Sequence, residues 1–158
     1  MKHVVELERP VIDPRFFAES RQSPSIRVGE VYVVFTSLEG TLAAVRVARD
    51  LAGGLGAPLT LIDFRTVPFP SAVESPGMRS PIEADAFVER LRDEGCELRA
   101  RVYLCRDASR AFPAAFRRHS LIVIGGLRRW WPTRPERWRR ELEAAGHFVV
   151  FVDEHEHA

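Results

Sequence analysis

An arginine-rich segment near the end of the chain contains the residues best suited to binding chemistry. Between residues 128 and 140 there are six arginines and one acidic residue, Glu136. Each guanidinium group can form two parallel hydrogen bonds with a phosphate or carboxylate group. Thr133 and Glu136 have the spacing of a capping box, so a helix is expected to begin beside the arginines and to place its positive dipole end there. The segment therefore has the residue types of an anion site, although arginines on a helix more often form a solvated face.

Three tryptophans, at positions 130, 131 and 138, lie within the same segment. Aromatic side chains between arginines can stack on the bases of single-stranded nucleic acid. Tryptophans more often cover a core or a subunit interface, and position 138 falls on the apolar face of the expected helix. The formal net charge of the whole chain is only +1, which gives little support to nucleic-acid binding. Nucleic acid or an acidic partner at the stripe 128–140 is therefore the lowest-ranked hypothesis.

The sequence lacks the common motifs of catalysis and of metal binding. It has no serine elbow, no His-Glu-x-x-His pair and no Walker lysine, since its only lysine is Lys2. Asp63 is expected near the carboxyl edge of a strand, but one acidic residue does not form an active site. His155 and His157 lie in a polar tail that fixes no geometry. We predict a protein that is not an enzyme, with no catalytic residue and no metal site.

The composition is that of an ordinary globular protein. With 158 residues, of which 46% are hydrophobic and 28% charged, the chain has material for one domain with a core. No run approaches the ~20 apolar residues that cross a bilayer, and the N-terminus lacks the apolar run of a signal peptide. Cys96 and Cys105 do not form a Cys-x-x-Cys unit, so both are expected to be plain thiols. The sequence predicts a cytoplasmic protein without membrane contact.

A regular alternation of strands and helices begins at residue 31. Continuous runs of β-branched and aromatic residues predict four buried strands, and apolar residues at three- and four-residue spacing predict helices between them. Residues 97–105 alternate between apolar and polar side chains, which predicts a strand nearer an edge of the sheet. The expected strands are 31–36, 59–64, 97–105, 121–124 and 148–152, and the expected helices are 39–54, 84–91, 107–119 and 133–145. Glycines 53, 54 and 56 are expected to end the first helix. Pro113 predicts either a kink in the helix at 107–119 or a helix start after a turn at 107–110.

Strands alternating with helices form a parallel sheet with right-handed crossovers. We predict an α/β fold with a doubly wound five-stranded parallel sheet, strand order 3-2-1-4-5, and helices on both faces in a three-layer sandwich over residues 30–153. Residues 1–29 are predicted to be a partly ordered N-terminal arm, and residues 154–158 a flexible tail. Ligands of such sheets bind at the carboxyl ends of the strands, where the strand order reverses. The proline-rich loop 68–82 and the arginine-rich segment are expected near that point.

From about residue 31 to residue 152 the sequence resembles the universal stress protein family. Three stretches carry the likeness: Val31–Glu39 with Ala48–Ala52, Asp107–Phe112 with Ser120–Gly125, and Glu141–Val152. The resemblance implies the same α/β fold. The last strand of that family often pairs across a two-fold axis, and unpaired apolar edges attract partners. We therefore predict a homodimer through the edge strand Phe148–Val152.

ATP-binding members of that family carry an aspartate at the end of the first strand and the motif Gly-x2-Gly-x9-Gly-Ser/Thr after the fourth. At the acidic position this chain has Thr36. The first glycine is retained as Gly125, with Gly126 beside it, but the second is replaced by Arg128, and no Gly-Ser/Thr pair follows at the required distance. Glycines at these places would let backbone amides approach phosphate oxygens. The resemblance therefore implies an ATP cradle that is broken in this chain.

Two main hypotheses follow. The first is a non-catalytic regulatory or protein-binding module that has no cofactor and lacks ordinary ATP binding. The second is a nucleotide or phosphate binder, with ATP or AMP as ligand, in which arginines replace the amide cradle. The vestigial or altered site would comprise Thr36, Asp63, Gly125, Gly126, Arg128, Arg129 and Thr133.

Overall fold

The fold follows the predicted alternation of strands and helices. A computed structural model of the chain describes residues 5–9, 29–66, 87, 89–92, 95 and 97–155, so the loop 68–82 lies outside the described residues. The strands are β1 (Val5–Arg9), β2 (Val31–Val34), β3 (Leu59–Thr66), β4 (Arg99–Cys105), β5 (Leu121–Gly126) and β6 (Phe148–Asp153). The helices are α1 (Leu38–Leu55), α3 (Ala108–Ala115) and α4 (Arg134–Ala144), and residues 87 and 89–92 are also helical. No helix in the described part of the chain is long and apolar enough to cross a membrane.

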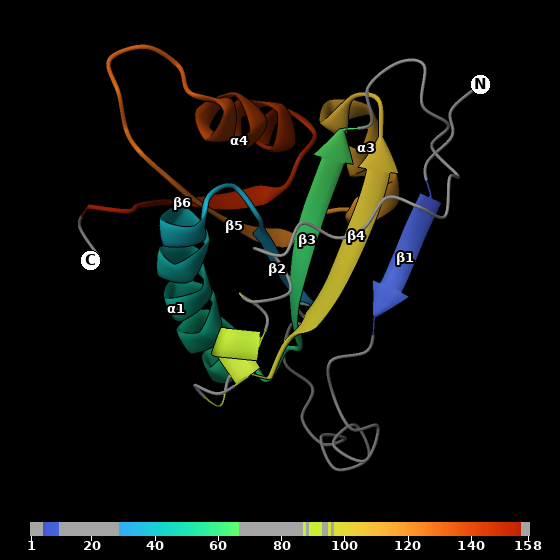
Figure 1. The fold of residues 1–158 in the computed structure, drawn as a ribbon, viewed down its shortest axis with the longest axis vertical. Coiled ribbons are helices and arrows are strands. Elements are labelled where there is room, and N and C mark those ends of the chain that lie inside the picture. Colours follow the sequence, from blue (N-terminus) through green and yellow to red (C-terminus); the bar gives the residue numbers. More distant parts are fainter. Residues whose placement is uncertain are drawn as a thin grey trace.

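In the part of the chain that the structure describes, the sheet has six strands in the order β1-β4-β3-β2-β5-β6 (Figure 1). The last five are parallel to their neighbours, which confirms the predicted order 3-2-1-4-5. The sixth strand, β1, pairs antiparallel with β4, with Val5 opposite Leu104. Its sequence Val-Glu-Leu-Glu-Arg has no continuous apolar run, and the sequence patterns therefore did not reveal it. The edge expected at strand 97–105 is thus occupied by β1.

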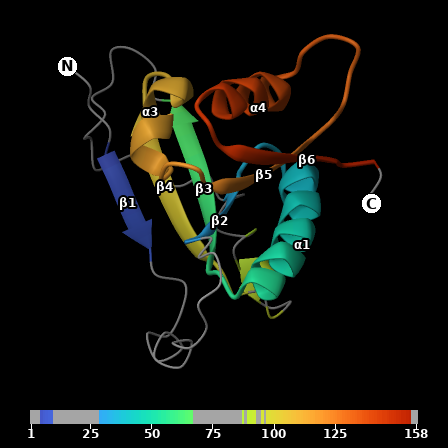
Figure 2. The same ribbon diagram turned by 180° about the vertical axis from the view of Figure 1, so that it is seen from behind.

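Helices cover both faces of the sheet, as the three-layer prediction requires. α1 packs on one face, and α3 and α4 pack on the other (Figure 2). In β2, Val31 and Val33 belong to the core under α1, whereas Tyr32 and Val34 belong to the core under α3 and α4. Because both faces are buried, the central strands β2 and β5 are continuous apolar runs.

A cluster of aromatic rings holds α3 and α4 against the sheet. Phe64 of β3 lies at its centre, with ring-centroid distances of 5.3 to 5.9 Å to its partners Tyr103, Phe112, Phe116 and Trp138. Trp138 is 6% exposed and comes from the first half of α4. This contact fixes the beginning of α4 above the carboxyl ends of the central strands.

The ends of α1 show how local residues set the helix length. Ser37 is the N-cap, and its Oγ accepts a hydrogen bond from the Gly40 amide at 3.0 Å. The helix ends at Gly56, whose φ of 60° lies in the left-handed region that favours glycine. Gly53 and Gly54 lie inside the helix, so the prediction that they help to end it is wrong. A glycine inside a helix costs about 1 kcal/mol but does not stop it.

The beginning of α3 excludes one of the two alternatives that Pro113 predicts, the helix start after a turn at 107–110. The helix starts at Ala108, because the Asp107 carboxylate accepts a hydrogen bond from the Ser109 amide at 3.1 Å and caps the first turn. A start beyond residue 110 is therefore wrong. Pro113 lies inside the helix, where it removes only the hydrogen bond to the Ser109 carbonyl.

Candidate functional site

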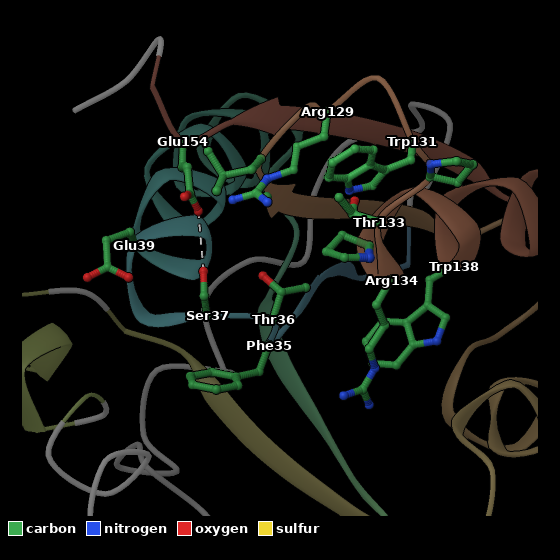
Figure 3. Close-up of a pocket in the computed structure, with 14 residues that line it drawn as sticks. Phe35, Thr36, Ser37, Glu39, Arg129, Trp131, Thr133, Arg134, Trp138 and Glu154 are labelled. Carbon is green, nitrogen blue, oxygen red and sulfur yellow. Dashed lines mark hydrogen bonds between the residues drawn. The ribbon is translucent and has the colours of Figure 1, made fainter.

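A pocket lies at the carboxyl ends of β2 and β5, where the strand order reverses. β2 is flanked by β3, which follows it in the chain, and by β5, which belongs to the second half of the fold. Open α/β sheets bind ligands at such switch points. The pocket has a volume of about 510 Å³, which is within the size range of small-molecule sites. Its walls come from the β2–α1 junction, the β5–α4 segment, the start of α4 and the residue after β6 (Figure 3).

The glycine pair at the end of β5 packs against helices on opposite faces of the sheet. A Cβ atom at Gly125 would lie 1.7 Å from the carbonyl oxygen of Gly40 in α1. A Cβ atom at Gly126 would lie 3.0 Å from Cγ of Pro135 in α4. Since successive strand residues face opposite ways, each glycine lets one helix approach the sheet. Both glycines thus have a packing role that differs from the phosphate cradle implied by the family resemblance.

Thr36 connects three elements at the base of the pocket. Its hydroxyl donates a hydrogen bond to the Gly125 carbonyl at 2.6 Å, and its amide donates one to Oγ1 of Thr41 at 3.1 Å. These bonds join the end of β2 to β5 and to the first turn of α1. Thr36 lines the pocket, but its hydroxyl proton is already used.

Carboxylates lie at the amino-terminal end of α1. Glu39 is in the first helical turn, and Glu154 accepts a hydrogen bond from the Ser37 hydroxyl at 3.3 Å (Figure 3). The same hydroxyl oxygen caps the helix. The positive end of a helix dipole favours anions, and here two negative side chains of the chain itself lie beside it.

The amino-terminal end of α4 offers few free amides. The Glu136 carboxylate accepts a hydrogen bond from the Thr133 amide at 3.1 Å, and Pro135 has no N–H group. Thr133 and Glu136 form the predicted capping box, although the Thr133 hydroxyl itself lies outside hydrogen-bonding geometry. Its Oγ1 is buried and has no hydrogen-bond partner among the described residues. The start of α4 therefore presents a carboxylate and an unpaired hydroxyl.

Two exposed arginines, Arg129 and Arg134, line the pocket together with the two glutamates at α1. The guanidinium carbon of Arg134 lies 4.3 Å from the ring centroid of Trp138. Arg128 lies outside the pocket lining, with its guanidinium carbon 5.7 Å from the ring centroid of Phe151. The pocket thus has a mixed charge and is not a uniformly positive site.

The structure brings together four of the seven residues predicted for the site. The four that line the pocket are Thr36, Gly126, Arg129 and Thr133. The sequence prediction therefore found the correct edge of the sheet but grouped packing residues with pocket residues.

Asp63 does not reach this pocket, and its predicted position is corrected. β3 continues to Thr66, so Asp63 lies three residues before the end of the strand. Its carboxylate is paired with Arg65 at 2.7 Å. The apolar run ends at Phe64, but backbone pairing with β4 extends the strand beyond that point.

Two pocket residues that sequence reasoning missed are Ser37 and Glu154. A serine directly before an amphipathic helical pattern is an N-cap signal and identifies Ser37. Glu154 has no local signal, because only the pairing of β6 with β5 brings it to the pocket. Its amide donates a hydrogen bond to the Gly126 carbonyl at 3.3 Å, although position 154 was assigned to the flexible tail.

A second pocket, of about 440 Å³, lies at the carboxyl ends of β3 and β4 beside α3. Arg134 and Trp138 line both pockets, and Arg106, Arg137 and two carboxylates also line the second. In the described part of the chain, no group of three or more histidine, cysteine, aspartate or glutamate side chains is placed to hold a metal ion. Because arginines and carboxylates line both pockets, each pocket has mixed charge.

Cys105 ends β4 close to this second pocket. It is buried, and its Sγ lies 3.7 Å from the Arg65 carbonyl. Burial, and then the negative charge of Asp107, raise the pKa of the Cys105 thiol. A raised pKa keeps the thiol protonated and weakly nucleophilic. Cys105 therefore acts as a core residue.

Comparison with known proteins concerns the fold only. No protein-family model matches the chain, and no match was found among curated proteins. A solved structure of a protein from the universal stress protein family of Burkholderia pseudomallei is similar to it. The two chains are 20% identical, the match covers 82% of this chain and 98% of the other, and the TM-score is 0.48.

Proposed function

We propose that the chain is a non-catalytic regulatory or protein-binding module, built like the universal stress proteins, that does not bind ATP in the ordinary manner of that family. One observation carries the proposal: both helix amino termini at the switch-point pocket already lie beside the chain's own carboxylates. These are Glu39 and Glu154 at α1, and Glu136 at α4. A triphosphate would meet negative charge where it needs amide donors.

Repulsion from these carboxylates is large compared with a single hydrogen bond. Two unit charges about 4 Å apart interact by about 4 kcal/mol at an effective dielectric constant of about 20. A hydrogen bond contributes a net stabilisation of about 1 kcal/mol. Arg129 and Arg134 line the same pocket and offset part of this negative charge, and Arg134 also stacks on Trp138. This balance of charges supports a pocket that does not take a polyphosphate.

The reactive groups of the pocket support binding rather than catalysis. The hydroxyl of Thr36 is engaged with Gly125, and that of Ser37 caps α1 while donating to Glu154. Both hydroxyl groups thus hold local structure together, Thr36 at the end of β2 and Ser37 at the start of α1. No histidine, lysine or cysteine is found among the described residues that line the pocket. The arrangement of nucleophile, base and orienting group that marks a covalent catalyst is therefore not assembled there.

Nucleotides are expected to leave the thermal stability of the protein unchanged. A ligand that binds only the native state at a concentration 100 times its Kd raises the free energy of unfolding by about 2.7 kcal/mol. For a chain of this size that corresponds to a rise in melting temperature of roughly 5–10 °C. With millimolar MgATP, AMP or pyrophosphate in a thermal-shift assay we expect a change below about 1 °C.

The second candidate function, phosphate or nucleotide binding through Arg129 and Thr133, is favoured by the unpaired Oγ1 of Thr133. It requires the opposite result, a saturable rise in melting temperature with AMP or phosphate. That rise should disappear in Arg129→Gln and Thr133→Val. Arg140→Gln is the matched control, because it removes an equal charge from an exposed position outside the pocket. Such a set of results would overturn the non-nucleotide proposal.

The proposal also includes a cytoplasmic location and a homodimer formed through β6. One side of β6 pairs with β5, and no strand of the described sheet pairs with its other side. Phe148, the first residue of β6, is 66% exposed. An apolar strand with an unpaired edge favours association with a second strand.

Phe148→Glu is expected to convert the dimer to a monomer. A buried carboxylate without a partner would cost several kcal/mol in the interface, so the dissociation constant should rise by at least about tenfold. Sedimentation velocity over a range of concentrations would measure this change. Leu55→Glu is the control, because Leu55 is 46% exposed on α1, away from the edge of the sheet. A wild-type protein that remains monomeric at high concentration would contradict the proposed dimer.

A further inference from the structure

Two tryptophans of the β5–α4 segment face solvent instead of the core. Trp130 is 89% exposed and Trp131 is 50% exposed, whereas Trp138 of the same arginine-rich segment is 6% exposed. The rings of Trp130 and Trp131 contact each other, with centroids 4.7 Å apart and an interplanar angle of 49°. Large exposed aromatic side chains are typical of binding sites and rare elsewhere on the surface of a monomer. The pair therefore contributes little to the core of its own chain.

Three arginines flank the tryptophan pair. Arg128 and Arg129 precede it, Arg134 follows it, and all three are exposed. Arg128 and Arg134 are stacked over aromatic rings of their own chain, which limits the motion of their guanidinium groups. In the part of the chain that the structure describes, none of the three forms an ion pair with a carboxylate. Their hydrogen-bonding edges are thus available to an external anion.

Arg129, Trp131 and Arg134 line the switch-point pocket, and Trp130 contacts Trp131. Arg129 and Trp131 extend from the β5–α4 segment over the side of the pocket opposite Phe35, and Arg134 lies at the start of α4 below them (Figure 3). The Arg/Trp surface is defined here as Arg128, Arg129, Trp130, Trp131 and Arg134. It combines an apolar centre with guanidinium groups around it, which is the composition of many protein-binding sites.

The surroundings of this surface favour carboxylates over a nucleic-acid backbone. Glu39 and Glu154 line the same pocket and would repel a continuous chain of phosphates more strongly than a short segment in which carboxylates alternate with uncharged residues. The rings of Trp130 and Trp131 contact each other, with centroids 4.7 Å apart, so the space between them is not open to a base. The net charge of +1 also gives little long-range attraction for a polyanion.

We propose that the Arg/Trp surface binds a short acidic segment of a partner protein, in which carboxylates alternate with aliphatic or aromatic side chains. The carboxylates pair with the forks of Arg129 and Arg134, and an apolar side chain packs on Trp130 and Trp131. Pro132 restricts the backbone of the segment, so less conformational entropy is lost when the partner binds. This inference rests on the proposed role as a protein-binding module and adds the chemistry of the partner.

The test uses a fluorescein-labelled synthetic peptide in which Asp and Glu alternate with Leu and Phe. A second peptide has Asn and Gln at the acidic positions. We expect the acidic peptide to bind the full-length protein in an anisotropy titration at low salt, and the amide peptide to bind at least about tenfold more weakly. Binding should also shift the tryptophan emission to shorter wavelength, because exposed indole rings become covered.

Variants locate the binding to the surface. Trp130→Ser and Arg129→Gln should each raise the dissociation constant of the acidic peptide by about tenfold. Neither substitution is expected to unfold the protein, because both side chains are exposed. The matched controls are Leu55→Ser and Arg49→Gln, an exposed apolar residue and an exposed arginine of α1. Both controls should leave the affinity within about twofold of wild type.

Several outcomes would overturn the inference. Equal affinity for the two peptides, or loss of binding in the control variants, would exclude the Arg/Trp surface as an acidic-peptide site. Tighter binding of a thymidine oligonucleotide or of phosphatidylserine vesicles, with the same dependence on Trp130 and Arg129, would assign the surface to nucleic acid or to a lipid headgroup. The nucleotide thermal-shift assay on the same preparation separates the two proposals, because absence of peptide binding alone leaves the non-nucleotide proposal standing.

Discussion

Replacing Gly125 by alanine is expected to lower the free energy of unfolding by about 3 kcal/mol. The added Cβ would lie 1.7 Å from the carbonyl oxygen and 2.4 Å from the carbonyl carbon of Gly40. Both atoms belong to backbone, so neither can rotate away as the end of a side chain can. The clash can be relieved only if α1 moves away from β5, which opens the packed interface between helix and strand. Thermal or urea denaturation would measure the loss, and a melting temperature lower by roughly 6–12 °C is expected.

Two other glycine substitutions serve as controls for this effect. Gly53→Ala should leave the protein as stable as wild type or stabilise it by up to about 1 kcal/mol, because Gly53 lies inside α1 with no atom within 4 Å of the new Cβ. Gly126→Ala should have an intermediate effect, since its Cβ would meet Pro135 side-chain carbons at 3.0 and 3.1 Å. If Gly125→Ala is as stable as wild type, the glycine is not needed for helix packing, and Gly125 is again a candidate for a phosphate site.

The fold was largely predictable because its signals are local or periodic. β2 and β5 are buried on both faces, so each is a run of apolar residues that stands out from the amphipathic helices. The first residues of β4 alternate between charged and apolar side chains, the pattern of a strand nearer an edge. Parallel strands with helical crossovers leave few possible topologies. β1 could not be found in this way, since its five residues carry three charges and it is held by backbone pairing with β4.

The candidate site was predictable only in part, because its chemistry depends on contacts between distant segments. The arginine-rich segment and the start of α4 were visible in the sequence, and both line the switch-point pocket. The contact of Glu154 with Ser37 spans more than a hundred residues and leaves no local pattern. The same limit explains why Gly125 was interpreted through a phosphate motif, when the nearest atoms belong to Gly40.

A buried carboxylate at the other end of the sheet could not be recognised from the sequence either. Glu30 is 6% exposed and lies next to the first residue of β2. It accepts hydrogen bonds from the Tyr32 hydroxyl at 2.7 Å and from the Thr60 hydroxyl, and it lies 3.9 Å from an Arg101 nitrogen. Burial, and then the hydrogen bond and charge of Glu30, raise the pKa of Tyr32, so the phenol stays protonated and remains a donor. Glu30 thus joins β2, β3 and β4 through side chains.

Glu30→Ala is therefore expected to destabilise the protein by about 3 kcal/mol or more. The substitution leaves the hydroxyls of Tyr32 and Thr60 buried without an acceptor, and a buried unsatisfied donor costs about 1–3 kcal/mol. It also removes the carboxylate that faces Arg101. Chemical denaturation would show a lower midpoint with an unchanged slope. Glu141→Ala, at an exposed position on α4, is the control and should stay within about 0.5 kcal/mol of wild type.

A combined variant separates loss of hydrogen bonds from loss of volume. Glu30→Leu alone should be strongly destabilising, because the two hydroxyl groups remain unpaired. Adding Tyr32→Phe and Thr60→Val removes both donors, so the triple variant should recover at least about half of the lost stability. If the triple variant is as unstable as the single one, the cost arises from packing around residue 30, and the hydrogen-bonded carboxylate does not hold the three strands together.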